Sequence, residues 1–103
     1  MFHSSYFMKK LRILLTCDDY LPHVGGAEVC TANLRKQLMR LGHTVTLYTN
    51  TTARMRGDAE AGVIRVPWRF RPGALLKNYR TLTRLIKQCD VVHSQYSFRL
   101  ACL

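Results

Sequence analysis

The chain is poor in acidic residues and contains no long apolar run. Its 103 residues include 6 Asp and Glu against 16 Lys and Arg, which gives a formal net charge of +10 at pH 7. Such a surplus favours an anionic partner, whether nucleic acid, an acidic membrane surface or a phosphate-bearing ligand, and does not choose among them. No apolar run is long enough to cross a bilayer, and LRILLTC is too short for a secretory signal, so we expect a cytoplasmic protein.

Closely spaced cysteines are absent as well. The four cysteines stand far apart, at Cys17, Cys30, Cys89 and Cys102. Without a C-x-x-C pair they do not indicate a zinc or redox site, and we expect reduced thiols with packing roles. The neighbouring carboxylates of Asp18 and Asp19 would point to opposite sides of an extended chain. We therefore expect no metal.

What the sequence does contain is a regular alternation of strands and helices. Hydrophobic residues make up 48% and charged residues 21%, which is typical of one ordinary globular domain. Short apolar runs predict strands at 11–16, 44–49, 62–67 and 90–94, and the helical period predicts helices at 27–41 and 75–89, with the start of another at 97–103. Residues 50–61 are predicted to form a loop. This order predicts an α/β fold, with a parallel sheet of strand order 3-2-1-4 and helices on both faces.

Two glycines lie between the first strand and the first helix. The segment DYLPHVGGAE runs through Pro22 to Gly25 and Gly26 and continues directly into the helix. Glycines at this point let a phosphate or sugar approach the free backbone N–H groups of the helix. A tight turn that only packs the helix against the sheet would use the same residues, so the segment by itself leaves both interpretations open.

Three segments together resemble the N-terminal domain of family 4 glycosyltransferases. They are D-x-Y-x-P-x-x-G-G-x-E from Asp18, R-L-G-H-T-V at the end of the first helix, and D-V-V-H-S-Q-Y-S from Asp90. The resemblance extends over nearly all of residues 11–103. It implies a retaining enzyme of the GT-B architecture, in which two Rossmann-like domains face each other across a cleft. It also implies a nucleotide-sugar donor, a sugar or lipid-linked acceptor, and neither a metal nor another cofactor.

The same resemblance implies a domain organisation. Residues 1–10 would be an N-terminal extension, and residues 11–103 an incomplete Rossmann-like domain on the acceptor side of the cleft. Relatives hold the nucleotide sugar mainly in a C-terminal domain, which this sequence does not contain. We therefore expect these 103 residues to be inactive by themselves.

The candidate binding residues follow the first and fourth strands, and none is assigned to catalysis. Gly25 and Gly26 would approach a diphosphate or an anionic acceptor, and His23 is either a substrate contact or an exposed loop residue. His93 ends a strand predicted to be central, where open α/β sheets bind ligands, although a satisfied core histidine is an equal interpretation. Many relatives read H-x-H here, whereas this chain has Gln95, which can hydrogen-bond a sugar hydroxyl but cannot accept a proton at neutral pH. The carboxylate of Glu28 suits the helix dipole whatever the function.

Basic residues gather on the second predicted helix. Their spacing of three, four and three makes one stripe of Lys77, Arg80, Arg84 and Lys87. Roughly opposite lies an apolar stripe, predicted as core, of Leu75, Tyr79, Leu82 and Ile86. A basic and aromatic segment, 65–71, precedes the helix. The basic stripe is either an ordinary solvated face or a contact with an anionic membrane surface.

Two other classes of protein fit less well. The net charge alone supports a small nucleic-acid-binding module, but no helix-turn-helix, RNP or zinc pattern is present. Aromatic residues are not interleaved with basic ones, apart from Trp68 and Phe70. A dinucleotide-binding domain disagrees with the glycine spacing and with Asn50, which stands where an acidic residue is expected. We therefore expect nucleic acid not to be a partner.

Overall fold

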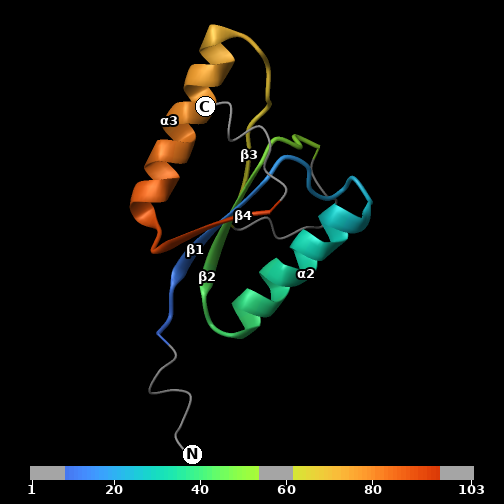
Figure 1. The fold of residues 1–103 in the computed structure, drawn as a ribbon, viewed down its shortest axis with the longest axis vertical. Helices are drawn as coiled ribbons and strands as arrows, with labels where there is room; N and C mark the ends of the chain where they lie inside the picture. Colours follow the sequence, from blue (N-terminus) through green and yellow to red (C-terminus); the bar gives the residue numbers. More distant parts are fainter. Residues whose placement is uncertain (1–8, 54–61, 96–103) are drawn as a thin grey trace, which may run out of the picture.

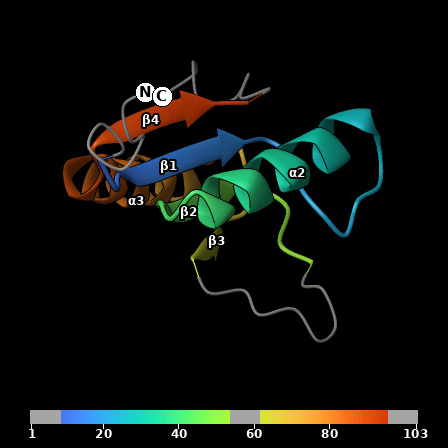
Figure 2. The same ribbon diagram turned by 90° about the horizontal axis from the view of Figure 1, so that it is seen from below.

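Four parallel strands form one sheet with the order β3-β2-β1-β4 (Figure 1). The computed structural model describes residues 9–53 and 62–95. Its elements are β1 (Arg12–Cys17), α2 (Gly26–Arg40), β2 (Thr44–Thr49), β3 (Val63–Arg65), α3 (Pro72–Gln88) and β4 (Val91–Ser94). The predicted strand order and direction are confirmed, and Figure 2 shows β4, β1 and β2 following one another across the sheet. The helix predicted at 97–103 and most of the predicted loop at 50–61 lie outside the described residues.

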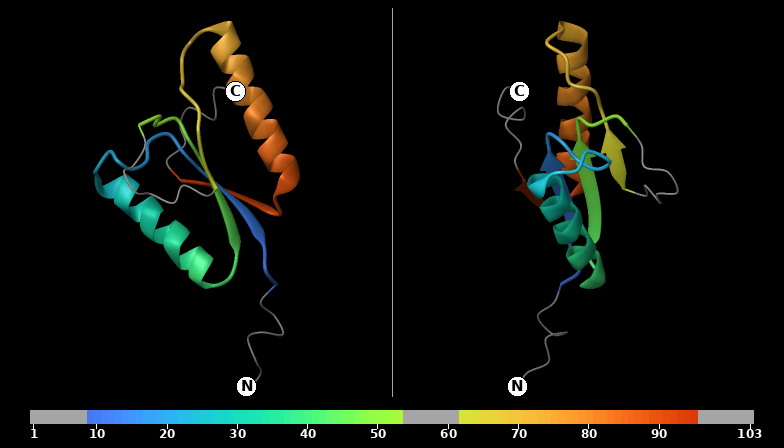
Figure 3. Two further views of the ribbon diagram at one scale, coloured as in Figure 1. Left: turned by 180° about the vertical axis from the view of Figure 1, so that it is seen from behind. Right: turned by 90° about the vertical axis from the view of Figure 1, so that its right-hand side faces the viewer.

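The two helices cover opposite faces of the sheet, as predicted (Figure 3). Successive strand residues point to opposite faces, so β1 contributes to both cores. Ile13 and Leu15 join the core beneath α2, which includes Leu34 and Leu38. Leu14 joins the core beneath α3, and this second core is made of Leu14, Tyr48, Val66, Leu82 and Leu85. Because both faces of β1 are buried, the strand is a continuous apolar run.

The buried face of α3 differs from the prediction. Leu82 is buried as expected, but Tyr79 and Ile86 are 54% and 46% exposed. Asn78 and Leu85 point inward instead, so that the buried positions are 78, 82 and 85, a helical spacing of four and three. The predicted apolar stripe was therefore wrong in its orientation, because a polar residue occupies an inward position.

Asn78 can be fully buried because its amide is paired with several partners. Its Nδ2 donates to the carbonyl oxygens of Pro67 and Ala74 at 3.0 and 2.9 Å. Its Oδ1 accepts from the Tyr48 hydroxyl and from Asn50 Nδ2. A buried amide with its donors and acceptors satisfied costs little, and here it joins α3 to β2 and to the segment before the helix.

β4 is attached to β1 by an ion pair at the start of both strands. Arg12 Nη2 lies 3.0 Å from Asp90 Oδ1, while Arg12 N and Nε donate to Asp90 Oδ2 at 2.8 and 3.3 Å. These hydrogen bonds from Arg12 lower the pKa of Asp90 to about 2. Val91 and Val92 are each 42% exposed. Within residues 9–53 and 62–95, β4 thus has β1 as its one neighbouring strand, as the predicted order 3-2-1-4 requires, and lacks the second neighbour that a central strand would have.

Candidate functional site

The glycine pair lies at the carboxyl edge of the sheet, between β1 and α2. Gly25 caps α2 in an extended conformation (φ −165°, ψ 174°) that any residue can adopt, and Gly26 is the first residue of the helix. A Cβ built on Gly26 would meet no atom of residues 9–53 and 62–95 within 4 Å. Neither an unusual backbone angle nor tight packing therefore accounts for a glycine at position 26.

Gly25 differs from Gly26 in having a close neighbour. A Cβ on Gly25 would collide with the carboxylate of Glu28, which folds back over the start of the helix. A carboxylate in the first turn of a helix stabilises it through the helix dipole, as expected for Glu28 from the sequence. The collision involves the end of a flexible side chain, so Gly25 is constrained only by where Glu28 lies.

The first turn of α2 presents backbone N–H groups toward this edge. The first backbone bond of the helix runs from Val29 N to Gly25 O at 3.1 Å, and Gly25 provides no side-chain cap. The N–H groups of residues 26–28 precede that bond, and such groups at a helix start have no partner within the helix. Together with the helix dipole, they form the kind of site that attracts phosphate and carboxylate groups.

His93 and Gln95 lie beside this helix start. His93 pairs in register with Leu15, whose side chain is in the core beneath α2. His93 Nε2 is 3.0 Å from Gln95 Oε1, and Gln95 Nε2 donates to Cys30 Sγ at 3.6 Å. An amide oxygen only accepts, so this hydrogen bond requires the tautomer of His93 with the proton on Nε2. The structure therefore brings both predicted residues to the α2 side of the sheet, next to the second turn of the helix.

Two further residues near the start of α2 are His23 and Cys30. His23 is exposed, and its backbone N–H donates to Tyr20 O at 3.2 Å. Cys30 is an exposed free thiol, contrary to the packing role expected for the cysteines. Its contact with Gln95 could not be predicted from the sequence. Cys17 fits the expectation: it is buried, and burial raises the pKa of its thiol to about 11. The prediction for Cys102 lies outside the described residues.

Arg65 has contacts at this edge that the sequence did not indicate. It lies in β3, within the strand predicted at 62–67, and its Nη1 donates to the carbonyl oxygens of Leu21 and Thr51 at 2.9 and 3.0 Å. Its guanidinium carbon also lies 5.8 Å from the centroid of the Tyr20 ring. Arg65 thus contacts the loop that leads to the glycine pair.

The basic stripe of Lys77, Arg80, Arg84 and Lys87 is exposed along α3. Beside it lie exposed apolar side chains, because Leu76, Tyr79 and Ile86 are 47%, 54% and 46% exposed. Before the helix, Phe70 is 81% exposed and packs edge-on against Trp68 with ring centroids 5.7 Å apart. The outer surface of α3 therefore combines positive charge with exposed apolar and aromatic groups.

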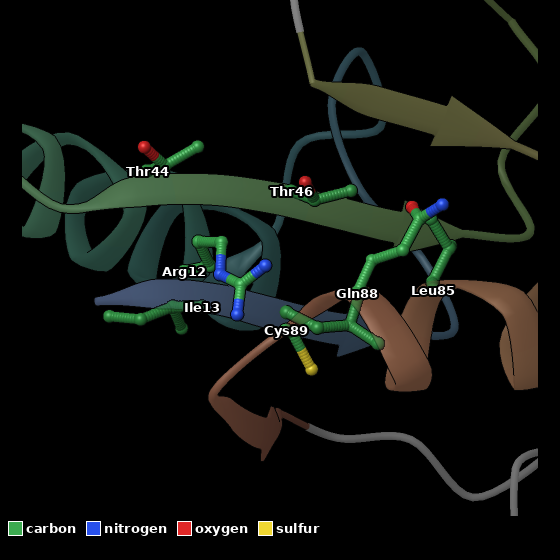
Figure 4. A pocket seen from close by; sticks show the side chains of 8 residues that line it. Arg12, Ile13, Thr44, Thr46, Leu85, Gln88 and Cys89 are labelled. Atoms are coloured by element: carbon green, nitrogen blue, oxygen red, sulfur yellow. The ribbon is translucent and has the colours of Figure 1, made fainter.

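A small hollow of about 130 Å³ lies at the opposite end of the sheet (Figure 4). It is lined by Arg12, Ile13, Leu14, Thr44, Thr46, Leu85, Gln88 and Cys89. Arg12 and Thr44 are the first residues of β1 and β2, so the hollow is at the amino edge of the strands, away from the glycine pair. It is therefore separate from the candidate site.

Among residues 9–53 and 62–95, no three His, Cys, Asp or Glu side chains are grouped so that they could hold a metal ion. Within the same ranges, neither helix has the length and apolar character needed to cross a membrane.

A known protein family matches the part of the chain that contains the candidate site. The family model for Glycosyltransferase Family 4 matches residues 24–103, a range that contains the glycine pair, His93 and Gln95. The chain belongs to glycosyltransferase family 4. The resemblance proposed from the three sequence segments is thereby confirmed, and the parallel sheet with helices on both faces agrees with the N-terminal domain of that family.

Three curated glycosyltransferases are similar over 90% of this chain. The chain is 28% identical over 102 residues to an alpha-monoglucosyldiacylglycerol synthase of Streptococcus pneumoniae and 29% identical over 101 residues to one of Acholeplasma laidlawii. It is 29% identical over 106 residues to a phosphatidylinositol N-acetylglucosaminyltransferase subunit of Arabidopsis thaliana. These matches cover 23%, 25% and 23% of the relatives, so the chain spans about a quarter of their length. No solved structure matches the chain.

Proposed function

We propose that the protein carrying this family 4 chain transfers a sugar from a nucleotide-sugar donor to an acceptor with retention of anomeric configuration. The observation that carries the proposal is Gly26. It is the first residue of the helix that begins at the carboxyl edge of a parallel sheet, and nothing in the described part of the chain requires it to be a glycine. A ligand that must approach the backbone closely does require it.

In this proposal the start of α2 binds an anionic group of the substrates. The free N–H groups of the first turn would bind the diphosphate of the donor or a phosphate of the acceptor, with Gly26 leaving space for it. The Glu28 carboxylate, which lies beside Gly25, would have to turn away when the anion binds. His93 and Gln95 would hydrogen-bond sugar hydroxyls, and His23 would contact substrate from the loop. Gln95 is no proton acceptor, so these residues would act by positioning and electrostatic stabilisation in a cleft.

We propose further that the acceptor is a lipid and that the enzyme acts at the cytoplasmic face of a membrane. Two of the similar proteins are named as synthases of a glucosylated diacylglycerol. The surface of α3 suits such a location, since it combines the basic stripe with exposed Tyr79 and Ile86. Each basic residue near an anionic membrane contributes about 1 kcal/mol of attraction. No metal or other cofactor is proposed.

The test is a transfer assay with the full-length protein. UDP-glucose, UDP-N-acetylglucosamine, UDP-galactose and GDP-mannose are offered with vesicles of diacylglycerol and phosphatidylglycerol, and the linkage of the product is determined by proton NMR. We expect an α-linked glycolipid from one of these α-configured donors, and no transfer by the 103-residue chain alone because it forms only one side of the cleft. A β-linked product, or no transfer by the full-length protein, would contradict the proposal.

A further inference from the structure

We infer that Arg65 is a positioning residue for the loop that carries Gly25 and Gly26, an inference that rests on the function proposed for that loop. Arg65 is the last residue of β3 and pairs in register with Thr49 of β2. Its side chain is half-buried and reaches past the end of β2 to the loop that follows β1. One side chain therefore connects three neighbouring strands at the carboxyl edge of the sheet.

The contacts of Arg65 suit a guanidinium in particular. Nη1 donates to Leu21 O at 2.9 Å and to Thr51 O at 3.0 Å, and the cation lies over the Tyr20 ring at 5.8 Å from its centroid. The planar guanidinium has several donors in fixed directions and stacks on aromatic rings. A lysine ammonium carries the same charge but lacks the planar group that combines these contacts.

The part of the loop that Arg65 contacts is fixed, and the part that follows is open. Tyr20 is buried, and its N–H donates to Thr51 Oγ1 at 3.0 Å. His23 N donates to Tyr20 O at 3.2 Å, but Val24 is 84% exposed and Gly26 has open space around it. The position of the glycine pair therefore depends on where the segment 20–23 is held.

The position of this segment matters because the proposed site must bring two groups of residues into contact with one substrate. The glycine pair must lie at a set distance from the side chains at the end of β4, His93 and Gln95, if one substrate is to contact both. A loop that is not held in place spends less time in the one arrangement that can bind, and the apparent affinity falls by the same fraction. Loss of the Arg65 contacts would thus weaken substrate binding even though Arg65 does not touch the substrate.

The experiment compares Arg65→Lys and Arg65→Met in the full-length protein. Hydrogen–deuterium exchange is followed by mass spectrometry in peptides that cover residues 18–25, and kcat and KM are measured with whichever of the four donors above is turned over fastest. Arg40→Met, at the exposed end of α2, controls for the loss of a positive charge. Ile13→Val, in the core at the amino end of β1, controls for a modest loss of stability.

Both Arg65 variants should exchange faster over residues 18–25, with kcat/KM reduced roughly tenfold, mainly through KM, as expected for the loss of hydrogen bonds to a charged group. The two control variants should retain the kinetic constants of the wild type. Exchange at the wild-type rate would overturn the inference, and so would faster exchange with kinetic constants equal to those of Ile13→Val. Failure of the proposed function would instead show as an absence of transfer by the wild-type protein.

Discussion

The Nε2 atom of His93 lies 3.0 Å from the Oε1 atom of Gln95, so the two candidate side chains at the end of β4 are hydrogen-bonded to each other. The same Gln95 amide donates to Cys30 on α2. Gln95 therefore links the end of β4 to the helix that begins at the glycine pair, where the proposed function places the substrate.

Replacing Gln95 tests this part of the proposed site. Gln95→Leu removes both hydrogen bonds and any bond to a sugar hydroxyl, so we expect kcat/KM of the full-length protein to fall roughly tenfold. Gln95→His restores the pattern of many relatives and should retain or raise kcat/KM. The matched control is Gln88→Leu, at the opposite end of the sheet, which should leave kcat/KM unchanged. Equal values for the two leucine variants would remove Gln95 from the site.

The Arg12–Asp90 pair makes stability depend on pH in a defined range. Because the pKa of Asp90 is lowered to about 2 in the folded protein from an ordinary value of 3.8, the ionised carboxylate is favoured by folding. The stability from this pair is fully present above pH 4 and is lost as the pH falls toward 2.

This pH dependence can be measured by urea unfolding of Asp90→Asn and the wild type at pH 7, 4 and 3. The urea midpoint of the variant should be lower than that of the wild type at pH 7, and the difference should shrink between pH 4 and pH 3. Asp19→Asn is the control for loss of a carboxylate elsewhere. A difference that stays constant down to pH 3 would show that the lowered pKa of Asp90 is not what stabilises β4.

The basic stripe on α3 should bind the protein to anionic membranes. The variant changes Lys77, Arg80, Arg84 and Lys87 to Gln. The folded wild type should sediment with vesicles that contain phosphatidylglycerol and not with vesicles of phosphatidylcholine, and this binding should weaken with added salt. The variant should remain in the supernatant with both kinds of vesicle.

A control with the same loss of charge separates the stripe from the net charge of the chain. It changes four exposed residues outside α3 to Gln: Lys9, Lys10, Lys36 and Arg40. This control should sediment nearly as well as the wild type. Equal sedimentation of both quadruple variants would leave the stripe as a solvated surface, and release of the wild type from vesicles by duplex or single-stranded DNA would favour the nucleic-acid interpretation.

The strand order could be predicted from the sequence, whereas the faces of α3 could not. Leu14 and Leu15 are both buried because helices cover both sides of β1, and such continuous apolar runs with helices between them indicate a parallel sheet. On α3, apolar character was a poor guide to burial. Asn78 is inward because Tyr48, Asn50 and two carbonyl oxygens satisfy its amide. Of these partners, Tyr48 and Asn50 are about 30 residues away in the sequence, so the pattern of the helix does not reveal them.

The candidate site likewise contains residues that the sequence indicates and one that it does not. Gly25, Gly26, His93 and Gln95 were found from their places in motifs at the ends of predicted strands. Arg65 was missed because a basic residue in a basic segment looks like surface, and its role depends on the carbonyl oxygens of Leu21 and Thr51. Backbone groups that come together only in the folded chain leave no pattern in the sequence.

The central claim is that Gly26 leaves space for a substrate, and Gly73 provides a matched control for it. Gly73 lies in the first turn of α3, and a Cβ on either glycine would meet no atom of the described residues within 4 Å. Valine at either position should therefore leave the fold intact, with melting temperatures close to that of the wild type.

The most direct test is the ratio of kcat/KM between Gly26→Val and Gly73→Val in the full-length protein, measured with thermal melts of both. A branched side chain at position 26 would occupy the space in front of the helix N–H groups, so we predict that kcat/KM falls at least tenfold for Gly26→Val, roughly the effect of losing one hydrogen bond to a charged group. Gly73→Val should match the wild type. Wild-type kcat/KM in a folded Gly26→Val protein would contradict the account.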